Sequence, residues 1–527
     1  MPKQKTDDLL KLVASLNRAE KRHFRLFVKR NQQANSEILF LRLFDIMERT
    51  GEYDEEYLLK RIEGIKKSQL SNLKAHLYKQ LLTSLRLLNR NKDEAILLRE
   101  SQDYARILYN KGLYRQALDV LDKAKKRARA THSHNVALEI AQFEKLIEGQ
   151  YVTRSIEGRA EQLEQECQEL TKMVAETDEL SSLSLRMYGL YLRLGLVSND
   201  HGLRTIRSIF RNQLPKVDYE ELDFWGKIYY AQSHAWYHLM CHEYPLGYRH
   251  TQRWVDLFHN HPQMVEAKAP LYLRGIHNNL AFLFNMWQYD KFIEQLKELE
   301  SFPDRYDLSN NINVAGLWNL YHFSHQIRRH YMEGTFREGL ELVPQIKEVI
   351  QNKVYNWDNY RVMIFNYRIA CLYFGSGDNE TAVDYLNEII NQRSPNYRSD
   401  IQAYARILSL ICHFEMGSVQ LVEYQVKSVY RFLAKVEHLQ ETQQLIFRFL
   451  RRIPRIREEQ LRDEFIKLKR KLDAVAEKPF ESRPFTWLDI PSWLEAKIEG
   501  KTVQEVIREK FLAQTNAQVE GQNTPVS

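Results

Sequence analysis

The sequence contains few of the residues that interrupt helices. Its 19 glycines and 13 prolines make up 32 of 527 residues, which is roughly half the usual share of these two types. Glycine and proline are unfavourable inside helices and common in turns, so a chain with few of them favours long helices joined by short connections. We therefore expect an all-α protein in which strands are scarce.

Long apolar runs and paired cysteines are also missing. No apolar run reaches the roughly 18 residues that a membrane-spanning helix requires, and Met1–Asp8 is polar and charged where a secretory signal would be apolar. Cys167, Cys241, Cys371 and Cys412 are far apart and form no C-x-x-C pair, so the sequence predicts neither a disulfide framework nor a zinc knuckle. We expect a cytoplasmic protein that does not enter a membrane.

The sequence also lacks the short motifs that identify common enzymes. It has no G-x-x-x-x-G-K-[ST] phosphate loop, no G-x-G-x-x-G dinucleotide motif, no G-x-S-x-G nucleophile turn and no H-E-x-x-H metal motif. We therefore expect a non-enzymatic protein that needs no cofactor.

Positive charge is concentrated near the N-terminus. The net charge of the whole chain is +7, but residues 1–92 carry 20 Lys or Arg against 11 Asp or Glu, which gives them +9 and the remainder −2. Clustered cations gain affinity for nucleic acids by displacing counterions from phosphates. Since no recognition signature accompanies the cluster, we favour a solvated helical surface and keep nucleic acid as the alternative partner.

The basic N-terminal segment, residues 1–94, is expected to form several short helices. Asn17 and Glu20 have the spacing of a capping box, in which each side chain satisfies an amide of the other residue. This predicts a helix over Arg18–Arg30. Leucines at every third or fourth position from Leu70 to Leu88 predict a longer helix with one apolar face.

The stretch Tyr109–Ala124 carries the clearest repeat signal and reads Y-N-K-G-L-Y-R-Q-A-L-D-V-L-D-K-A. Gly112 ends one helix, and Tyr114 packs beside the turn. The small Ala117 and Ala124 allow the next helix to approach closely. This pattern resembles the central turn of tetratricopeptide-repeat (TPR) hairpins. The resemblance implies a right-handed α-solenoid of TPR-like helical hairpins.

Similar turns recur along the chain, most of them with an aromatic or apolar residue two positions later. The turn residues are Gly112, His242, Trp287, Gly334, Gly377 and Gly417. The residue two positions after the turn residue has number 289, 336, 379 or 419 in the last four turns, so these turns are 47, 43 and 40 residues apart. With further turns expected near Ser155 and Asp200, we predict about eight hairpins over residues 95–450, with lengthened helices and about 40–47 residues per repeat.

The pattern changes after residue 450. A charged helix over Arg457–Val475 and a later amphipathic segment containing Trp493 predict a C-terminal helical cap over residues 451–513. A terminal repeat would otherwise leave an apolar face in water. Residues 514–527 are polar, and we expect them to form a disordered tail.

The TPR resemblance also implies a binding surface, because in that family the first helices of the hairpins line a concave face that binds peptides. On this face it places Arg106, Tyr109, Asn110, Gln232, Trp236, Arg274, His277, Asn278, Phe284, Tyr321, Ser324, Arg328, Tyr331, Tyr367 and Phe374. Aromatic side chains mixed with arginine and asparagine suit a groove that holds an extended peptide. Tight packing between repeats is the alternative explanation for the same residues.

His234, His238 and His242 recur every four residues on one expected helix. Imidazoles at this spacing can share a metal ion. The repeat register, however, places His234 and His238 on the packing side of the first helix. We therefore favour a packing role and expect no metal site.

Three functions follow, in order of preference. The first is a non-enzymatic scaffold that binds a protein or peptide partner on its concave face. The second is a transcriptional regulator with a DNA-contacting basic N-terminal segment and a peptide-sensing solenoid, which requires salt-sensitive affinity of that segment for duplex DNA. The third is a metal-dependent enzyme built on the histidine row, which requires stoichiometric zinc or nickel. The sequence does not fix the oligomeric state.

Overall fold

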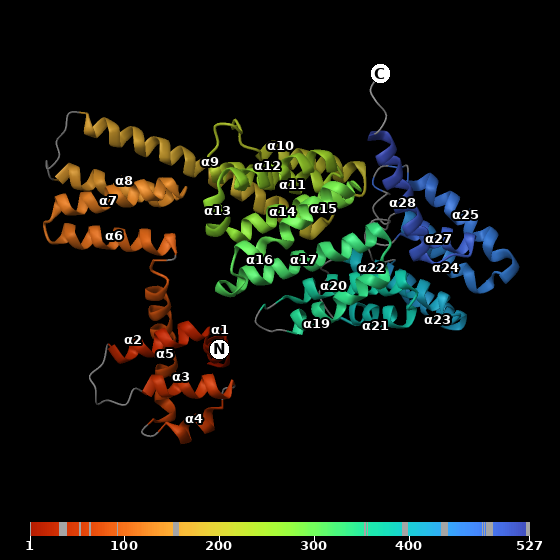
Figure 1. Ribbon diagram of the computed structural model, residues 1–527, viewed down its shortest axis with the longest axis horizontal. Coiled ribbons are helices and arrows are strands. Elements are labelled where there is room, and N and C mark those ends of the chain that lie inside the picture. The colour runs from red at the N-terminus through yellow and green to blue at the C-terminus, as the bar shows by residue number, and fades with distance from the viewer. Residues whose placement is uncertain are drawn as a thin grey trace. The chain divides into compact units, whose positions relative to one another are not determined.

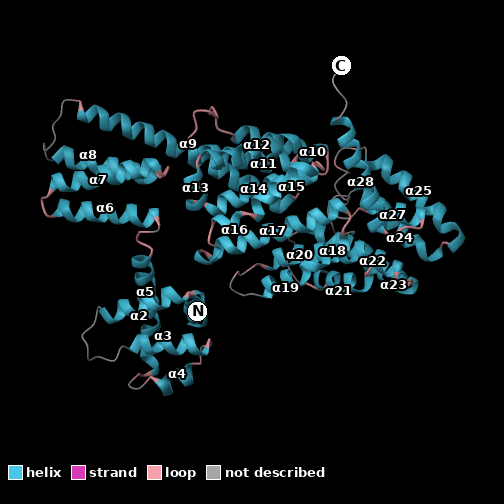
Figure 2. Ribbon diagram, viewed as in Figure 1, coloured by secondary structure: helices cyan, strands magenta, loops and turns pink. Residues whose placement is uncertain are grey.

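The described chain is helical throughout. The computed structural model describes residues 2–30, 39–51, 54–62, 65–91, 93–150, 158–351, 355, 357–392, 399–433, 441–476, 478, 480 and 489–522. These residues contain α-helices and short 3-10 helices and no strand (Figure 2), which confirms the all-α prediction. No helix within these ranges combines the length and the hydropathy needed to cross a membrane.

The chain divides into two compact units, Met1–Val174 and Ala175–Ser527. The boundary falls inside one long helix, α9 (Arg159–Leu194). The sequence suggested limits at residues 94 and 450. These limits mark changes in the sequence pattern, and neither coincides with the boundary in α9.

The first unit contains two groups of helices. Their bounds are α1 Pro2–Ser15, α2 Arg18–Arg30, α3 Leu39–Thr50, α4 Glu55–Arg61, α5 Lys67–Leu88, α6 Glu94–Asn110, α7 Tyr114–Ala130 and α8 His134–Gln150. α1, α2 and α3 pack against α5, whereas α6, α7 and α8 lie side by side in sequence order (Figure 1). The second group therefore has the arrangement of a helical repeat.

The predicted start of α2 is confirmed. The Asn17 amide donates to the Glu20 carboxylate over 2.8 Å, and the Glu20 amide donates to the Asn17 side chain over 2.9 Å. This reciprocal cap satisfies amides that have no partner inside the helix. Phe24 of α2 then packs edge-on against Phe44 of α3, with ring centroids 4.8 Å apart, in the core of this group.

The second unit contains the C-terminal part of α9 and all later helices. Their bounds are α10 Asp200–Gln213, α11 Phe224–Met240, α12 Tyr244–Asn260, α13 Pro262–Ala267, α14 Ala269–Asn285, α15 Tyr289–Glu300, α16 Phe302–Arg305, η1 Leu308–Asn310, α17 Ile312–Glu333, α18 Phe336–Gly339, η2 Leu340–Leu342, α19 Val343–Gln351, α20 Asn359–Ser376, α21 Asn379–Ile390, α22 Ser399–Glu415, α23 Val419–Leu433, α24 Glu441–Arg452, η3 Ile453–Arg455, α25 Glu458–Ala476, α27 Ile490–Glu499 and α28 Val503–Gln522. Consecutive helices from α11 to α23 pack as hairpins, and each hairpin packs on the next (Figure 1).

Short turns close these hairpins, and the six turns expected from sequence all connect two helices. At each, one residue has a positive φ: Gly112, His242, Trp287, Gly334, Gly377 and Gly417. A left-handed residue after a helix lets the amides that follow donate hydrogen bonds to the last carbonyl groups of that helix. The Glu243 amide, for example, donates to His238 O over 2.9 Å. A seventh such turn at His132, between α7 and α8, was not predicted. The turn expected near Ser155 lies outside the described residues.

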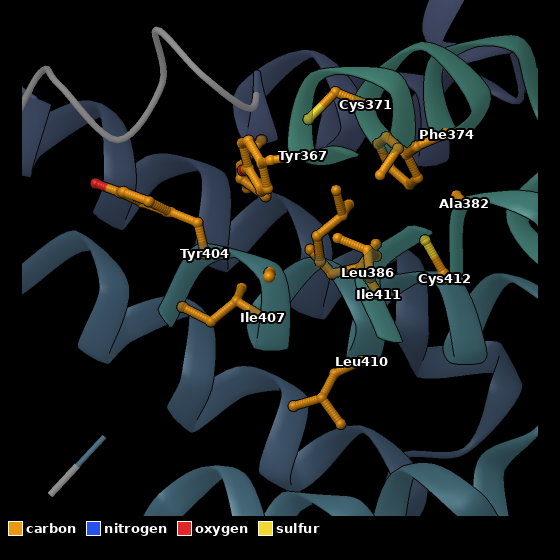
Figure 3. Packing of buried hydrophobic residues seen from close by; sticks show 14 of the residues in the cluster. Tyr367, Cys371, Phe374, Ala382, Leu386, Tyr404, Ile407, Leu410, Ile411 and Cys412 are labelled. Atoms are coloured by element: carbon orange, nitrogen blue, oxygen red, sulfur yellow. The ribbon is translucent and has the colours of Figure 1, made fainter. Parts of the chain in front are cut away.

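The largest core extends from α17 to the C-terminal helices. Figure 3 shows part of it, where Tyr367 and Phe374 of α20, Leu386 of α21 and Ile411 of α22 converge. All four side chains are at most 5% exposed. Facing hairpins therefore share one continuous apolar interior, as stacked repeats require.

The C-terminal helices pack on two different parts of the second unit. Trp493 of α27 donates to Glu415 of α22 over 2.8 Å. α28 instead returns to the turn between α17 and α18, where Arg508 donates to Glu333 O over 3.1 Å. Because α28 ends at Gln522, residues 514–522 are helical, in contrast to the expected disorder, and residues 523–527 lie outside the described chain.

Gly334 is the point where α28 meets this turn. Its φ is +65°, and a Cβ built there would lie 2.6 Å from the Arg508 amide nitrogen. Gly417 has a similar φ of +72°, but a Cβ there would meet no atom within 4 Å. A residue with a side chain would therefore be strained by the positive φ at both positions, but only at position 334 would it also collide with α28.

We expect Gly417→Ala to lower the free energy of unfolding by about 1 kcal/mol, because it adds only left-handed strain. Gly334→Ala should cost roughly 2–3 kcal/mol more, since the α28 backbone must also move. Urea unfolding measures both values, and hydrogen exchange should report faster exchange in α28 for Gly334→Ala alone. Equal effects of the two changes would show that α28 is not held at this turn.

A buried charge network joins α7, α8 and α9 in the first unit. Lys125 contacts Glu144 and lies 2.9 Å from Glu166, and Arg129 lies 2.8 Å from Glu166. Burial raises the pKa of the fully buried Glu144 carboxyl. Burial also opposes ionisation of Glu166, but Lys125 and Arg129 outweigh it and hold its pKa below the usual value.

We expect Lys125→Met to lower the free energy of unfolding by about 3–5 kcal/mol, because it leaves the buried Glu144 without its main counter-charge. Lys123→Met, on an exposed position of the same helix, should change it by less than about 0.5 kcal/mol. Chemical denaturation measures both. If the double variant Lys125→Met, Glu144→Leu recovers none of the loss, uncompensated charge is not its cause.

Candidate functional site

The second unit contains a cavity of about 450 Å³ that is lined by helices α9, α11, α14, α17 and α20. The last four are the first helices of successive hairpins, and no second helix contributes to the wall. The cavity opens to solvent along α9, where Leu185 is 72% exposed. Its volume lies in the range of ligand-binding clefts.

Aromatic side chains form one side of the cavity. The indole of Trp236 on α11 lies against Tyr188 and Tyr191 of α9, with ring centroids 4.9 and 5.1 Å apart. Tyr321 of α17 stacks on His277 of α14 at 4.1 Å. These flat surfaces are held in place by their neighbours and can contact a ligand at a low cost in side-chain entropy.

Four arginines share the wall: Arg274, Arg328, Arg361 and Arg368. Among the described residues that line the cavity there is no aspartate or glutamate. Arg361 pairs at 3.7 Å with Asp358, which lies outside the wall. The described wall of the cavity therefore contains cationic side chains and no anionic one.

Arg328 is half-buried, with part of its surface open to the cavity. Its guanidinium lies over the Phe284 ring, 5.1 Å from the centroid. Burial, together with the positive charge of Arg368, lowers the pKa of Arg328 to about 9. The protein therefore holds two guanidinium groups close together in a place where neither is well solvated.

Arg328 also fixes the protonation of two histidines. A guanidinium can only donate, so its 3.3 Å contact with Nδ1 of His325 makes that nitrogen an acceptor. His325 then donates from Nε2 to Nδ1 of His277 over 2.9 Å, which leaves the proton of His277 on Nε2. Burial and the nearby arginines hold the pKa of both histidines well below the ordinary value. His277 thus gives the wall a neutral N–H donor.

Arg368 is positioned from two sides. Its Nη1 donates to the Ser324 hydroxyl over 2.7 Å, and that hydroxyl donates to Leu320 O over 2.5 Å. The Tyr331 hydroxyl donates to the backbone carbonyl of Arg368 over 2.6 Å. α17 therefore orients the guanidinium that α20 supplies.

Eight of the fifteen residues that the sequence placed on the binding face line this cavity. They are Gln232, Trp236, Arg274, His277, Asn278, Tyr321, Ser324 and Arg328. The structure thus brings together expected residues from α11, α14 and α17.

Four expected residues of the second unit do not line the cavity. Tyr367 and Phe374 lie in the core at 1% and 5% exposure (Figure 3). Phe284 is buried and Tyr331 half-buried, each beside an arginine of the wall. Phe284, Tyr331 and Phe374 each precede the turn residue by three positions, where the helix end packs on its neighbours.

The remaining expected residues, Arg106, Tyr109 and Asn110, belong to α6 in the first unit. Arg106 lies over the Phe143 ring at 4.6 Å, and the Tyr109 hydroxyl donates to Gln150. Asn110 is exposed. They are not part of the cavity.

Sequence reasoning missed two parts of the wall. One is the α9 surface with Leu185 and Tyr188. A turn was expected near Asp200, and Gly195 after α9 has a positive φ of +71°, but no residue of the helix before this turn was assigned to the concave face. The other is Arg361 and Arg368 of α20. Arg368 follows Tyr367 directly, and one residue turns a helix by about 100°, so the register on α20 was displaced by one position.

The histidine row lies between α11 and α12. His234 and His238 are each 7% exposed, and both stack on His250 of α12, with ring centroids 4.3 and 5.4 Å apart. His242 faces elsewhere and bonds Val197 O through Nε2 at 2.8 Å. Among the described residues no three His, Cys, Asp or Glu side chains are grouped for a metal ion.

Burial lowers the pKa of His234 to about 4 and, with the charges of His234 and His238, that of His250 to about 3. Both pKa values lie below 6.5, the pKa of a histidine in the unfolded chain. The contribution of these neutral histidines to the free energy of unfolding is therefore complete above pH 6.5 and is lost as the pH falls towards 4. Protonation at low pH therefore favours unfolding.

We expect His250→Phe to reduce this loss by about 2–3 kcal/mol at pH 4, because the ring can still stack and no longer titrates. The exposed His201→Gln should leave the pH dependence unchanged. Urea unfolding at pH 7, 5.5 and 4 measures the difference. Parallel curves for wild type and His250→Phe would contradict the assignment.

The basic N-terminal helices are partly neutralised. Arg25 of α2 lies 2.8 Å from Asp45 and also contacts Glu48 of α3. Lys21 lies 3.4 Å from Glu48, and Lys67 lies 3.1 Å from Glu55. These pairs reduce the positive charge that the segment presents to a nucleic acid.

Comparison with protein-family models, with curated proteins and with solved structures gives no match.

Proposed function

We propose that this protein is a non-enzymatic scaffold that binds a segment of a partner protein in the cavity between α9, α11, α14, α17 and α20. The supporting observation is that consecutive first helices direct aromatic and hydrogen-bonding side chains into one cavity. Tyr188, Trp236 and Tyr321 offer stacking surfaces, and Gln232 and Asn278 offer amides that suit a peptide backbone. The open side along α9 gives an extended chain room to enter and leave.

We further propose that the hairpins form a right-handed, TPR-like solenoid, with the cavity on its concave face. Support comes from the left-handed turn residues at Gly112, Gly334, Gly377 and Gly417 and from the serial packing of hairpins. In such an array the first helices face inward, and in this protein the first helices are the ones that line the cavity.

A photo-crosslinker can test this occupancy directly. We expect benzoylphenylalanine at Leu185, on the open side of the cavity, to give defined adducts with a partner protein in intact cells, because a bound segment passes within its reach. Leu246 on α12 is an exposed leucine outside the wall, at 47% exposure, and serves as the matched control. Gel mobility and mass spectrometry of the adducts provide the readout.

A Trp236→Ala change in the Leu185 crosslinker background should remove most of these adducts while the melting temperature stays within a few degrees of wild type. Adducts that are the same at both leucines, or that persist without Trp236, would contradict occupancy of the cavity.

The alternative, a regulator whose basic N-terminal segment contacts DNA, receives less support. The ion pairs of Lys21, Arg25 and Lys67 already use part of its positive charge. We therefore favour the scaffold.

A further inference from the structure

A groove in the second unit lies apart from the cavity described above. It has a volume of about 490 Å³ and is formed by α23 and by the end of α24 with η3, which pack against α23. Val426 and Pro454 give it apolar surface. None of its described lining residues also lines the first cavity. This surface, the α23 groove, is therefore a separate place where a ligand can bind.

Positive charge lines the α23 groove. Its described lining contains one carboxylate, that of Glu423, and the four cations Lys427, Arg431, Arg451 and Arg455. The net charge of this lining is thus +3. Arg431 donates to the backbone carbonyl of Lys427 over 3.4 Å, which leaves its charge in place. Within the described chain none of the four cations is in an ion pair, whereas the adjacent Arg452 pairs with Glu464 at 3.4 Å.

Two tyrosine rings beside these cations are open to solvent. Tyr430 lines the groove and is 55% exposed, and one face of its ring is backed by Phe447, with centroids 6.1 Å apart. Tyr424 is 77% exposed. Tyr424, Lys427 and Arg431 have the spacing of residues on one helix face. α23 therefore presents flat aromatic surfaces next to cations that have no counter-charge.

This combination distinguishes between anionic partners. An acidic peptide would pair with the cations, but its charge makes no use of open rings beside them. A nucleic-acid duplex offers phosphates, but its bases are stacked on one another. A single strand offers phosphates that bind to cationic grooves and unstacked bases that bind to aromatic side chains. Of the three, only the single strand uses both features of the groove.

We infer that the α23 groove binds single-stranded nucleic acid, with phosphates on its four cations and bases stacked on Tyr424 and Tyr430. The site differs from the basic N-terminal helices, where acidic neighbours pair with part of the positive charge. It also shares no described lining residue with the cavity of the proposed scaffold. The two proposals are therefore independent.

Fluorescence anisotropy with the full-length protein tests the inference. The probe is a labelled strand of mixed sequence, as DNA and as RNA, about 12 nucleotides long, which lies in the range that single-strand sites cover. The same sequence as a duplex and a glutamate peptide of equal charge are the competitors. At least one of the single strands should bind about tenfold more tightly than the duplex or the peptide, because stacking adds to the attraction between charges.

The salt dependence reports the phosphate contacts. The logarithm of the association constant should fall with the logarithm of the salt concentration with a slope of about −3, since each of four phosphate contacts contributes about −0.7. The double variant Lys427→Gln, Arg431→Gln should reduce this slope to about −1.5. The double variant Arg18→Gln, Arg22→Gln removes the same charge, at the same spacing, from exposed positions of α2 and should leave the slope unchanged.

The rings are tested separately from the charges. Tyr424→Ala and Tyr430→Ala should each weaken single-strand binding by about tenfold and leave the salt slope unchanged. Tyr430→Phe keeps the ring against Phe447 and should bind as wild type does. All the substituted positions are exposed, so the melting temperatures should stay within a few degrees of wild type.

Each contrary result has its own meaning. Equal affinity for the duplex or for the glutamate peptide would overturn the single-strand assignment. Equal slopes in the two double variants would place the phosphate contacts outside the α23 groove. If neither strand binds at about 0.05 M salt, where the electrostatic attraction is strong, the inference fails. None of these results bears on the crosslinks formed from Leu185, so the scaffold proposal stands or falls by itself.

Discussion

Each hairpin of this protein depends on one residue with a left-handed backbone conformation. That residue reverses the chain within three or four positions, as His242 does between Met240 and Tyr244, and so makes adjacent helices antiparallel. A reversal this short leaves a helix little freedom to rotate or slide. First helices therefore follow one another on one side of the second unit, and second helices are kept out of the cavity wall. The turns therefore determine which helices form the wall of the cavity, whatever side chains those helices carry.

The cavity wall combines tightly packed aromatic rings with charged groups. The wall packs tyrosine, tryptophan and histidine rings tightly enough to stack, yet it also holds guanidinium groups that would be more stable in water. Ring faces and the Ser324 hydroxyl hold Arg328 and Arg368 in place. A surface used only for packing would place apolar side chains here at less cost. The stability of the fold therefore does not explain why these arginines lie in the wall.

Helix ends and turns could be predicted from sequence because their signals are local. The capping box of Asn17 and Glu20, and the glycines at left-handed positions, act within three or four residues. The site was predictable where the turn lies a fixed distance from the wall, as for Arg274 and Arg328. The prediction of site residues was wrong on α20, where Tyr367 faces the core and the adjacent Arg368 faces the cavity. A shift of one residue moves a side chain to a different face of the helix, and only tertiary packing determines which face is turned to the cavity. The α9 wall was not predicted, although a turn was expected near Asp200 and Gly195 does have a positive φ of +71°, because no residue of the helix before this turn was assigned to the concave face.

The position of α28 adds a constraint on the order of assembly. Arg508 bonds a carbonyl group 175 residues earlier in the chain, and Gln504 bonds the Arg337 amide across 167 residues. Stacked hairpins make mostly local contacts and can form as they leave the ribosome, N-terminal hairpins first. The turn between α17 and α18 cannot be completed in this way, because α28, which covers it, is synthesised after the hairpins. Chains that lack α28 would thus keep Gly334 uncovered at the end of α17, and α17, which carries Arg328, would reach its final environment only after α28 has formed.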